Sequence, residues 1–319
     1  PNKLINFAND EEAQAKWVNQ HLADIINGYI ATCKNGNTLD PDELRKAFTG
    51  IGYDGKNVPR FRVSEKHVVD ILYAKMLLKA LSSGKSSITL LTGVGGAGKS
   101  TATRQMDLSN RGVVYDSAFN SFSSLEKAIK KAKAAGIKDI QVVAVHNDAL
   151  TAFKNTVNRG LSSGRFLSLS YFIDDAFPKN AGKIVALSEK YPDVDIVCYD
   201  NSHNDASNRE NGGLVSLEAA KRWDYSVSNT LINQLLDIIE DGTNKGRFTK
   251  DQAASLGFGL QEVPRSHGAV ADPSTIERIA RIGRRIRQEV GGDIRPSTSG
   301  EQPLVRGDGL HQPGGPRPH

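Results

Sequence analysis

The chain has 319 residues, of which 38% are hydrophobic, and its 41 Lys and Arg against 36 Asp and Glu give a formal net charge of +5. This composition is typical of a soluble globular protein that is long enough for two domains, and it excludes the dense positive surface of a dedicated nucleic-acid binder. No apolar run approaches the roughly 18 residues of a membrane span, and no signal segment opens the sequence. We therefore expect a cytoplasmic protein, or one delivered into another cell as an effector. The two cysteines, Cys33 and Cys198, argue against a disulfide framework.

Residues 1–83 are predicted to form an N-terminal helical region. Apolar residues recur every three or four positions from Glu11 to Ile30, which indicates one buried helical stripe. Asp40, followed by Pro41, has the pattern of an N-cap and a first helical position. A third helix is expected from Ser64 to Leu81.

Residues 84–202 have the alternating pattern of an α/β core. Strands are predicted at 88–93, 112–116, 140–148 and 194–202, and helices at 123–135, 148–158 and 180–190. Strands that are apolar throughout and alternate with helices are typical of a parallel sheet covered on both faces. The predicted fold class is therefore α/β, with the parallel sheet of a P-loop NTPase and flanking helices.

Residues 203–291 are predicted to form a C-terminal helical extension, with one helix from Leu214 to Ile239 and a last helix that begins at Asp272. The last helix contains the sequence RIARIGRRIR, whose five arginines indicate either a solvated face or a surface for RNA, DNA or an acidic partner. We favour the solvated face, because no aromatic residues are interleaved to stack on bases. Residues 292–319 are rich in Pro and Gly and are expected to be disordered.

The segment from Gly93 to Ser100 reads GVGGAGKS and satisfies the Walker A pattern G-x-x-x-x-G-K-[ST] in full. It lies after an apolar strand and before a helix, where a phosphate-binding loop must lie. Its backbone N–H groups would wrap the phosphates of ATP, Lys99 would reach the β and γ phosphates, and Ser100 would bind Mg²⁺. The alternative, a turn that only closes a strand onto a helix, is disfavoured. The predicted nucleotide-binding residues are Gly93, Gly95, Gly96, Ala97, Gly98, Lys99, Ser100 and Thr101.

Asp116 ends the strand GVVYD and is the first candidate for an acid beside the nucleotide. In a parallel sheet the ligand crevice lies at the carboxyl ends of the strands, so this carboxylate is expected next to the phosphates. It would act as general base for an acceptor hydroxyl or, with Ser100, as a ligand of Mg²⁺. The alternative is a cap of the following turn.

The order of these elements resembles the zeta toxin family of P-loop kinases, whose relatives include chloramphenicol phosphotransferase. The resemblance rests on LLTGVGGAGKSTATRQM, GVVYDSAF, the region from AIKKAKAAG to LSSGRF, and DIVCYDNS, and it covers about 68–202. It implies a kinase that transfers the γ phosphate of ATP to a sugar hydroxyl of a nucleotide-linked metabolite, typically UDP-N-acetylglucosamine. It further implies an Asp after the loop as base, and an antitoxin or chaperone as a protein partner.

The sequence departs from the family pattern because only about a dozen residues separate Thr101 from GVVYD, so one strand-helix unit is missing. Asp116 therefore matches either of two family acids, and the acceptor is open. Plant-pathogen effectors with a zeta-like kinase domain phosphorylate NAD, which makes NAD the second candidate acceptor.

Two arginines are expected to complete the site. Arg159 is placed at the end of the helix from Asp148, and Arg165 follows the turn GLSSG, so both could close over the triphosphate, in the region where the resemblance places lid arginines. Solvated surface arginines are the alternative.

Three further residues are weaker candidates. We expect Asp174 and Asp175 to begin a helix rather than contact a substrate, and His146 to cap or pack rather than catalyse.

The main hypothesis is an ATP-dependent small-molecule kinase that uses Mg²⁺ and binds no membrane. The alternatives are an ATPase or switch module that drives a partner, and a polynucleotide 5′-kinase.

Overall fold

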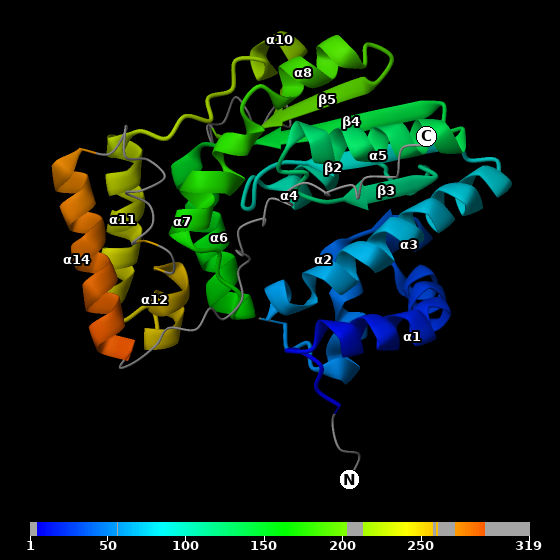
Figure 1. Ribbon diagram of the computed structural model, residues 1–319. Helices are drawn as coiled ribbons and strands as arrows, with labels where there is room; N and C mark the ends of the chain where they lie inside the picture. The colour runs from blue at the N-terminus through cyan, green and yellow to red at the C-terminus, as the bar shows by residue number, and fades with distance from the viewer. Residues whose placement is uncertain (1–4, 56, 203–212, 258–259, 261–271, 291–319) are drawn as a thin grey trace, which may run out of the picture.

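The computed structural model describes residues 5–55, 57–202, 213–257, 260 and 272–290. Its centre is a six-stranded sheet with the order β1-β3-β2-β4-β5-β6, in which only the β5–β6 pair is antiparallel (Figure 1). The fold is therefore α/β, with a mostly parallel sheet flanked by helices, as predicted. The strands are β1 (Thr38–Leu39), β2 (Ser87–Thr92), β3 (Val113–Asp116), β4 (Asp139–His146), β5 (Asp195–Asp200) and β6 (Leu214–Val215).

The parallel strands separate two apolar cores because their successive side chains point to opposite faces. Val142 of β4 belongs to the core that contains the N-terminal helices, whereas Val143 belongs to the core on the other face. Leu90 and Leu91 of β2 are divided in the same way. Nearly continuous apolar strands are thus explained by burial on both faces.

The first core joins the N-terminal region to the sheet. Helix α3 packs against β3 and α5, α5 packs against α8, and α1 packs on α3 (Figure 1). The longest of these helices begins at an N-cap, Asp10, whose side chain accepts a hydrogen bond of 2.9 Å from the backbone N–H of Ala13. The elements are α1 (Glu11–Thr32), α2 (Pro41–Leu44), α3 (Arg62–Ser82), α5 (Phe122–Ala135) and α8 (Lys183–Lys190).

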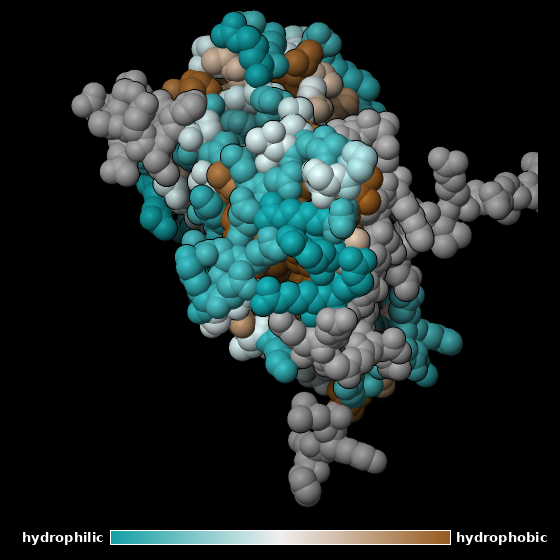
Figure 2. Space-filling view, turned by 90° about the vertical axis from the view of Figure 1, so that its left-hand side faces the viewer, coloured by the Kyte–Doolittle hydropathy of each residue, from teal (hydrophilic) through white to brown (hydrophobic). Residues whose placement is uncertain are grey.

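The second core joins the opposite face of the sheet to the C-terminal helices. Helix α6 packs against α11, and α14 packs against both α11 and α12. These three C-terminal helices lie beside α6, away from the sheet (Figure 1), and the face that they present is mostly hydrophilic (Figure 2). The elements are α6 (Ala149–Ser163), α7 (Leu169–Tyr171), α11 (Asn229–Asn244), α12 (Lys250–Leu256) and α14 (Pro273–Val290). Helix α10 (Leu217–Ala220) instead packs on β5, and its Ala220 belongs to a separate small apolar cluster.

Strand β2, which precedes the Gly-rich loop, lies between β3 and β4. The chain passes from β2 to β3 on one side and then crosses to β4 on the other. Ligands of open α/β sheets bind at such a switch point, outside the carboxyl ends of the strands. The sheet order therefore places the loop where a ligand crevice is expected.

Two predictions about the flanking regions are wrong. The N-terminal region is not entirely helical, because Thr38 and Leu39 form a strand that pairs with β3. The single helix predicted from Leu214 to Ile239 is instead strand β6 and helices α10 and α11, which Ser216 and Ser228 cap separately. The helical pattern of the sequence continued across this break, but each serine accepts the hydrogen bond that starts a new helix.

The remaining boundaries agree with the predicted elements within a few residues, except that α6 extends to Ser163. The predicted disordered tail, 292–319, lies outside the described residues. Among the residues that are described, no helix is both long and apolar enough to cross a membrane.

Candidate functional site

The loop from Gly93 to Gly98 has a backbone that requires glycine. Gly93, Gly96 and Gly98 have φ values of 152°, 81° and 91°. A Cβ on Gly93 would lie 2.5 Å from the carbonyl oxygen of Val145, and one on Gly96 would lie 2.1 Å from that of Ala152. The glycines thus allow both the left-handed turns and the close approach to β4 and α6.

Two asparagines hold the loop by its carbonyl groups. The Asn155 side chain donates to the Gly96 oxygen at 2.9 Å, and the Asn201 side chain donates to the Ala97 oxygen at 2.8 Å. Besides the N–H of the buried Val94, three N–H groups of the loop, all in partly exposed residues, have no hydrogen-bond partner within the described part of the chain. An anion with several oxygens fits such a row of donors. They belong to Gly95, Gly96 and Gly98.

Helix α4 (Lys99–Thr103) follows the loop and has only five residues. Ser100 lines the large cavity described next, whereas the exposed Thr101 lines neither that cavity nor the arginine pocket beside the loop. The Thr101 N–H donates to the oxygen of Gly98 at 2.9 Å, so it is already used within the loop. The N–H groups of Gly93 and Ala97 are also used within the protein, and neither these two residues nor Lys99 line either pocket.

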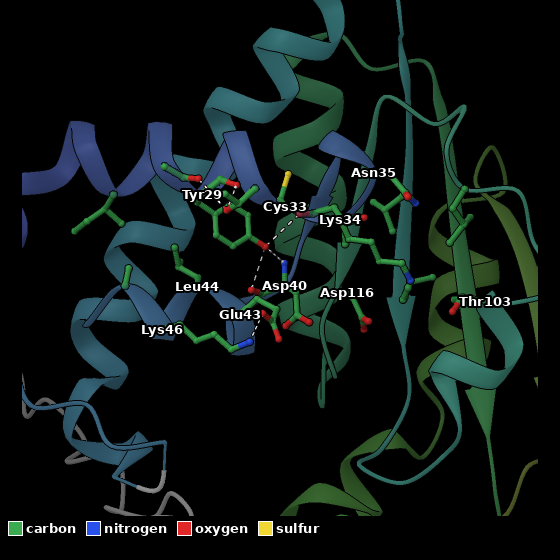
Figure 3. Close-up of a pocket in the computed structure, with 18 of the residues that line it drawn as sticks. Tyr29, Cys33, Lys34, Asn35, Asp40, Glu43, Leu44, Lys46, Thr103 and Asp116 are labelled. Carbon is green, nitrogen blue, oxygen red and sulfur yellow. Dashed lines mark hydrogen bonds and ion pairs between the residues drawn. The ribbon is translucent and has the colours of Figure 1, made fainter. Parts of the chain in front are cut away.

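Asp116 and Ser100 face one cavity of about 1020 Å³. Asp116 is the last residue of β3 and is paired with Leu91 near the carboxyl end of β2. The opposite walls come from α1, the turn after it, β1 and α2 (Figure 3). Burial raises the pKa of Asp116, against the opposing charge of Lys99. The structure thus brings together the loop serine and the predicted acid beside an open space.

Asp40 lies next to Asp116 and was not predicted as a site residue. Thr38 pairs with Val114 and Leu39 with Tyr115, so the parallel register continues to Asp40 beside Asp116 (Figure 3). Burial and then the charges of Asp42 and Asp116 raise the pKa of Asp40 to about 6.

The prediction that Asp40 is an N-cap is correct, since its carboxylate accepts from the N–H of Asp42 at 2.8 Å. Its position beside Asp116 could be found from sequence only through the short pattern TLD, which ends in Asp after an apolar residue, as VVYD does after a longer strand. A two-residue strand has no periodicity to detect.

Arg159 and Arg165 lie beside the loop in a second pocket of about 160 Å³, which Arg45 and Arg62 also line. Thr156 connects this pocket to the loop, because its methyl group would be 3.1 Å from a Cβ on Gly96. The predicted pair of arginines is therefore brought together near the phosphate-binding loop. Arg159 does not end its helix, however, because α6 continues to Ser163.

The arginine pocket contains one carboxylate, Asp42. Its two oxygens bind Arg45 at 2.7 Å and Arg165 at 2.5 Å. Although burial alone would raise it, the charges of these guanidinium groups lower the pKa of Asp42 to about 2. Burial and the charge of Arg165 lower the pKa of Arg159. Asp42 thus neutralises two guanidinium groups that could otherwise bind a phosphate group.

Lys183 is a buried amine behind the loop, and sequence reasoning missed it. Its Nζ donates to Thr92 Oγ1 at 2.8 Å, to the Phe119 oxygen at 3.0 Å and to Asn180 Oδ1 at 2.5 Å. Burial, and then the charge of Lys99, lower the pKa of Lys183 to about 7. Lys183 ties the last residue of β2 to the segment that follows β3. Its only sequence signal was a lysine near the start of an amphipathic helix, which is usually exposed.

The weaker candidates lie outside both pockets. His146 is buried and stacks on Trp223 with ring centroids 4.9 Å apart, which agrees with a packing role. Asp174 and Asp175 do not begin a helix as expected, because Ser168 is the N-cap and both acids lie in a π-helical turn after α7.

The arginines of α14 are partly neutralised within the protein. Arg278 forms ion pairs with Asp237 and Glu240 of α11, and Arg281 also pairs with Glu240. These ion pairs agree with the predicted charged face on the surface of the protein.

The described residues contain no group of three or more His, Cys, Asp or Glu side chains arranged to hold a metal ion. This is compatible with Mg²⁺ that is bound largely by phosphates and water, with one or two protein ligands. Ser100 with Asp116 or Asp40 has the oxygen chemistry for that role.

No protein-family model matches the chain, and a search of curated proteins finds no match.

Proposed function

We propose that this protein is an ATP-dependent P-loop phosphotransferase that phosphorylates a hydroxyl group of a small molecule. The observation that carries the proposal is the cavity of about 1020 Å³ in which Ser100 of the loop and Asp116 of the neighbouring strand face the same space. A kinase needs such a second pocket for the acceptor beside the γ phosphate.

The donor side is assigned to the loop. The free N–H groups of Gly95, Gly96 and Gly98 bind phosphate oxygens, and Lys99 supplies positive charge to the β and γ phosphates. The Ser100 hydroxyl, with Asp116 or Asp40, would hold Mg²⁺, which neutralises charge on the phosphates when bound. Arg159 and Arg165 would stabilise the charge of the transferring group, once a phosphate displaces Arg165 from Asp42.

The acceptor side is assigned to the carboxylates. Asp116 accepts the proton of the acceptor hydroxyl as its oxygen attacks the γ phosphorus. The bond from this phosphorus to the β–γ bridging oxygen breaks, and ADP leaves with the electron pair. A base works best when its pKa is close to the working pH, so the raised pKa of Asp116 supports this assignment, although the pKa of the neighbouring Asp40 is raised as well.

The resemblance to zeta toxins supplies candidate acceptors, UDP-N-acetylglucosamine first and NAD second, and an antitoxin or chaperone as a partner. A polynucleotide acceptor has less support, because carboxylates line the cavity and would repel a phosphate backbone.

The test is transfer of label from [γ-³²P]ATP, with Mg²⁺, to a panel of sugars, amino sugars, UDP-sugars, NAD and oligonucleotides. We expect one class of acceptor to become labelled. Lys99→Ala should reduce the rate by orders of magnitude, whereas Lys75→Ala, a change of an exposed lysine on α3, should not. Equal rates for the wild type and Lys99→Ala would contradict the proposal.

A further inference from the structure

We infer that the acceptor is an amine-bearing polyhydroxyl compound without phosphate groups, of the amino sugar class. This inference rests on the proposed function and names the substrate class of the same site. It departs from the nucleotide-linked acceptors that the resemblance implies, and the composition of the cavity wall supports it.

The described residues that line the cavity carry more negative than positive charge. The carboxylates come from α1, the residue between β1 and α2, α2 itself, the turn after α4, and β3, so they surround the space rather than share one element. Lys46 and Glu43 are paired with each other at 2.5 Å, which leaves four of the five acids against one lysine, Lys34. The acids are Asp24, Asp40, Glu43, Asp107 and Asp116.

The arginines lie in another place. Arg45, Arg62, Arg159 and Arg165 line the small pocket beside the loop and not the large cavity. Guanidinium groups are the usual partners of phosphate in proteins. The pyrophosphate of UDP-N-acetylglucosamine or NAD would therefore meet carboxylates in the cavity, whereas an ammonium group would gain charge-assisted hydrogen bonds there.

The pair of Asp40 and Asp116 gives the cation a defined position. These carboxylates stand at the ends of adjacent parallel strands and line the same cavity, so their like charges repel one another. A bound ammonium group between or beside them would relieve this repulsion. The hydroxyl to be phosphorylated would then lie near Asp116 on the side of Ser100.

The outer wall fits a ring compound. Trp17 and His21 of α1 stack with ring centroids 4.4 Å apart and both line the cavity, as does Tyr29. The C–H face of a sugar ring packs on such aromatic surface while its hydroxyls bind carboxylates. Ligand pockets commonly measure about 300–1,000 Å³, so this cavity is large enough for a compound with several rings.

Binding without ATP tests the inference separately from phosphate transfer. Calorimetry would compare kanamycin A, a three-ring amino sugar compound, with maltotriose, a neutral compound of three rings, and with UDP-N-acetylglucosamine and NAD. At pH 7.5 and 150 mM salt, we expect kanamycin A to bind at least tenfold more tightly than each of the other three.

A charge-reversal pair tests the location. Asp24→Lys on the exposed face of α1 should weaken kanamycin A binding at least tenfold, whereas Glu189→Lys on α8, with the same change of net charge, should not. Thermal unfolding would check that both variants fold. Tighter binding of UDP-N-acetylglucosamine or NAD, or equal effects of the two variants, would overturn the inference.

The outcomes separate the two proposals. If a nucleotide-linked acceptor is phosphorylated and kanamycin A does not bind, the proposed function stands and the inference fails. If kanamycin A binds as described but no compound accepts label from [γ-³²P]ATP, the cavity binds amines and the proposed function fails.

Discussion

The two halves of the candidate site are built in different ways. The donor half is one contiguous segment, 93–100, whose backbone provides the binding groups and whose glycines permit its path. The acceptor half is assembled from α1, β1, α2 and β3, and its side chains provide the binding groups (Figure 3). A fixed backbone loop suits phosphate, which is common to all nucleotides. Side chains from several elements suit a particular acceptor, because each of them can be substituted without disturbing the backbone of the loop.

The largest expected effect is on the rate of phosphate transfer, and it distinguishes the roles of Asp116 and Asp40. If Asp116 is the base, Asp116→Asn should slow transfer by about 10²- to 10⁴-fold and leave the affinity for MgATP nearly unchanged. Asp40→Asn, its matched control on the adjacent strand, should slow transfer less. Steady-state kinetics and nucleotide titration would measure both quantities.

A larger loss of transfer in Asp40→Asn would assign the base to the N-terminal region instead. A large loss of MgATP affinity in Asp116→Asn would show that Asp116 is a metal ligand.

The second prediction tests the backbone of the donor half. Gly96→Ala should abolish MgATP binding, because its Cβ would lie 2.1 Å from the Ala152 oxygen and φ is 81°. Gly136 has a φ of 96°, but a Cβ added there would contact nothing. Gly136→Ala therefore measures the cost of the dihedral angle alone, about 1 kcal/mol of stability. Fluorescence titration and chemical unfolding would compare the two. Retained MgATP affinity in a folded Gly96→Ala protein would show that the loop need not keep this path.

The third prediction concerns the support of the donor half by Lys183. Lys183→Met leaves the acceptors Thr92, Phe119 and Asn180 without their donor, which should cost about 1–3 kcal/mol of unfolding free energy. Lys138→Met, at an exposed position, is the control.

The same lysine gives a pH dependence with a defined sign. Because the pKa of Lys183 is lowered to about 7, the unfolded chain holds a proton that the folded chain has lost between about pH 7 and 10. The free energy of unfolding of the wild type, relative to that of Lys183→Met, should therefore increase as the pH rises from about 7 to 10. Urea unfolding at several pH values would measure it, and a difference that falls with rising pH would contradict the assignment.

The smallest expected effect concerns Asp42, which links the halves. Its lowered pKa means that its contribution to stability is complete above about pH 4 and is lost as the pH falls towards 2. Because 44% of the side chain is exposed, screening limits this contribution to about 1 kcal/mol or less. Asp42→Asn should thus lose less stability than the wild type between pH 4 and 2, which urea unfolding at these pH values would measure.

The donor half and the sheet could be predicted from sequence because their signals are local. Eight consecutive residues specify the loop, and runs such as 139–146 identify buried strands without knowledge of their partners. Asp116 followed from the rule that crevices lie at the carboxyl ends of strands.

The acceptor half of the site and the break between α10 and α11 depend on contacts between residues that are distant in sequence. Asp40 joins the site only because Thr38 and Leu39 pair with β3, and a strand of two residues is too short for its pattern to predict that pairing. The break between α10 and α11 was hidden for a related reason. Trp223 donates its indole N–H to Asp200 at 2.9 Å, so a contact with the sheet holds the chain between the two helices in addition to the local cap at Ser228.

The short strand β1 also has a consequence for folding kinetics. Strands β2 and β3 follow one another in the chain, whereas β1 reaches β3 only after a much longer loop is closed. Contacts that are distant in sequence form slowly, because their loop entropy must be overcome before pairing stabilises the chain. During refolding we therefore expect MgATP binding to recover before phosphate transfer, with the delay set by the docking of residues 38–40 onto β3.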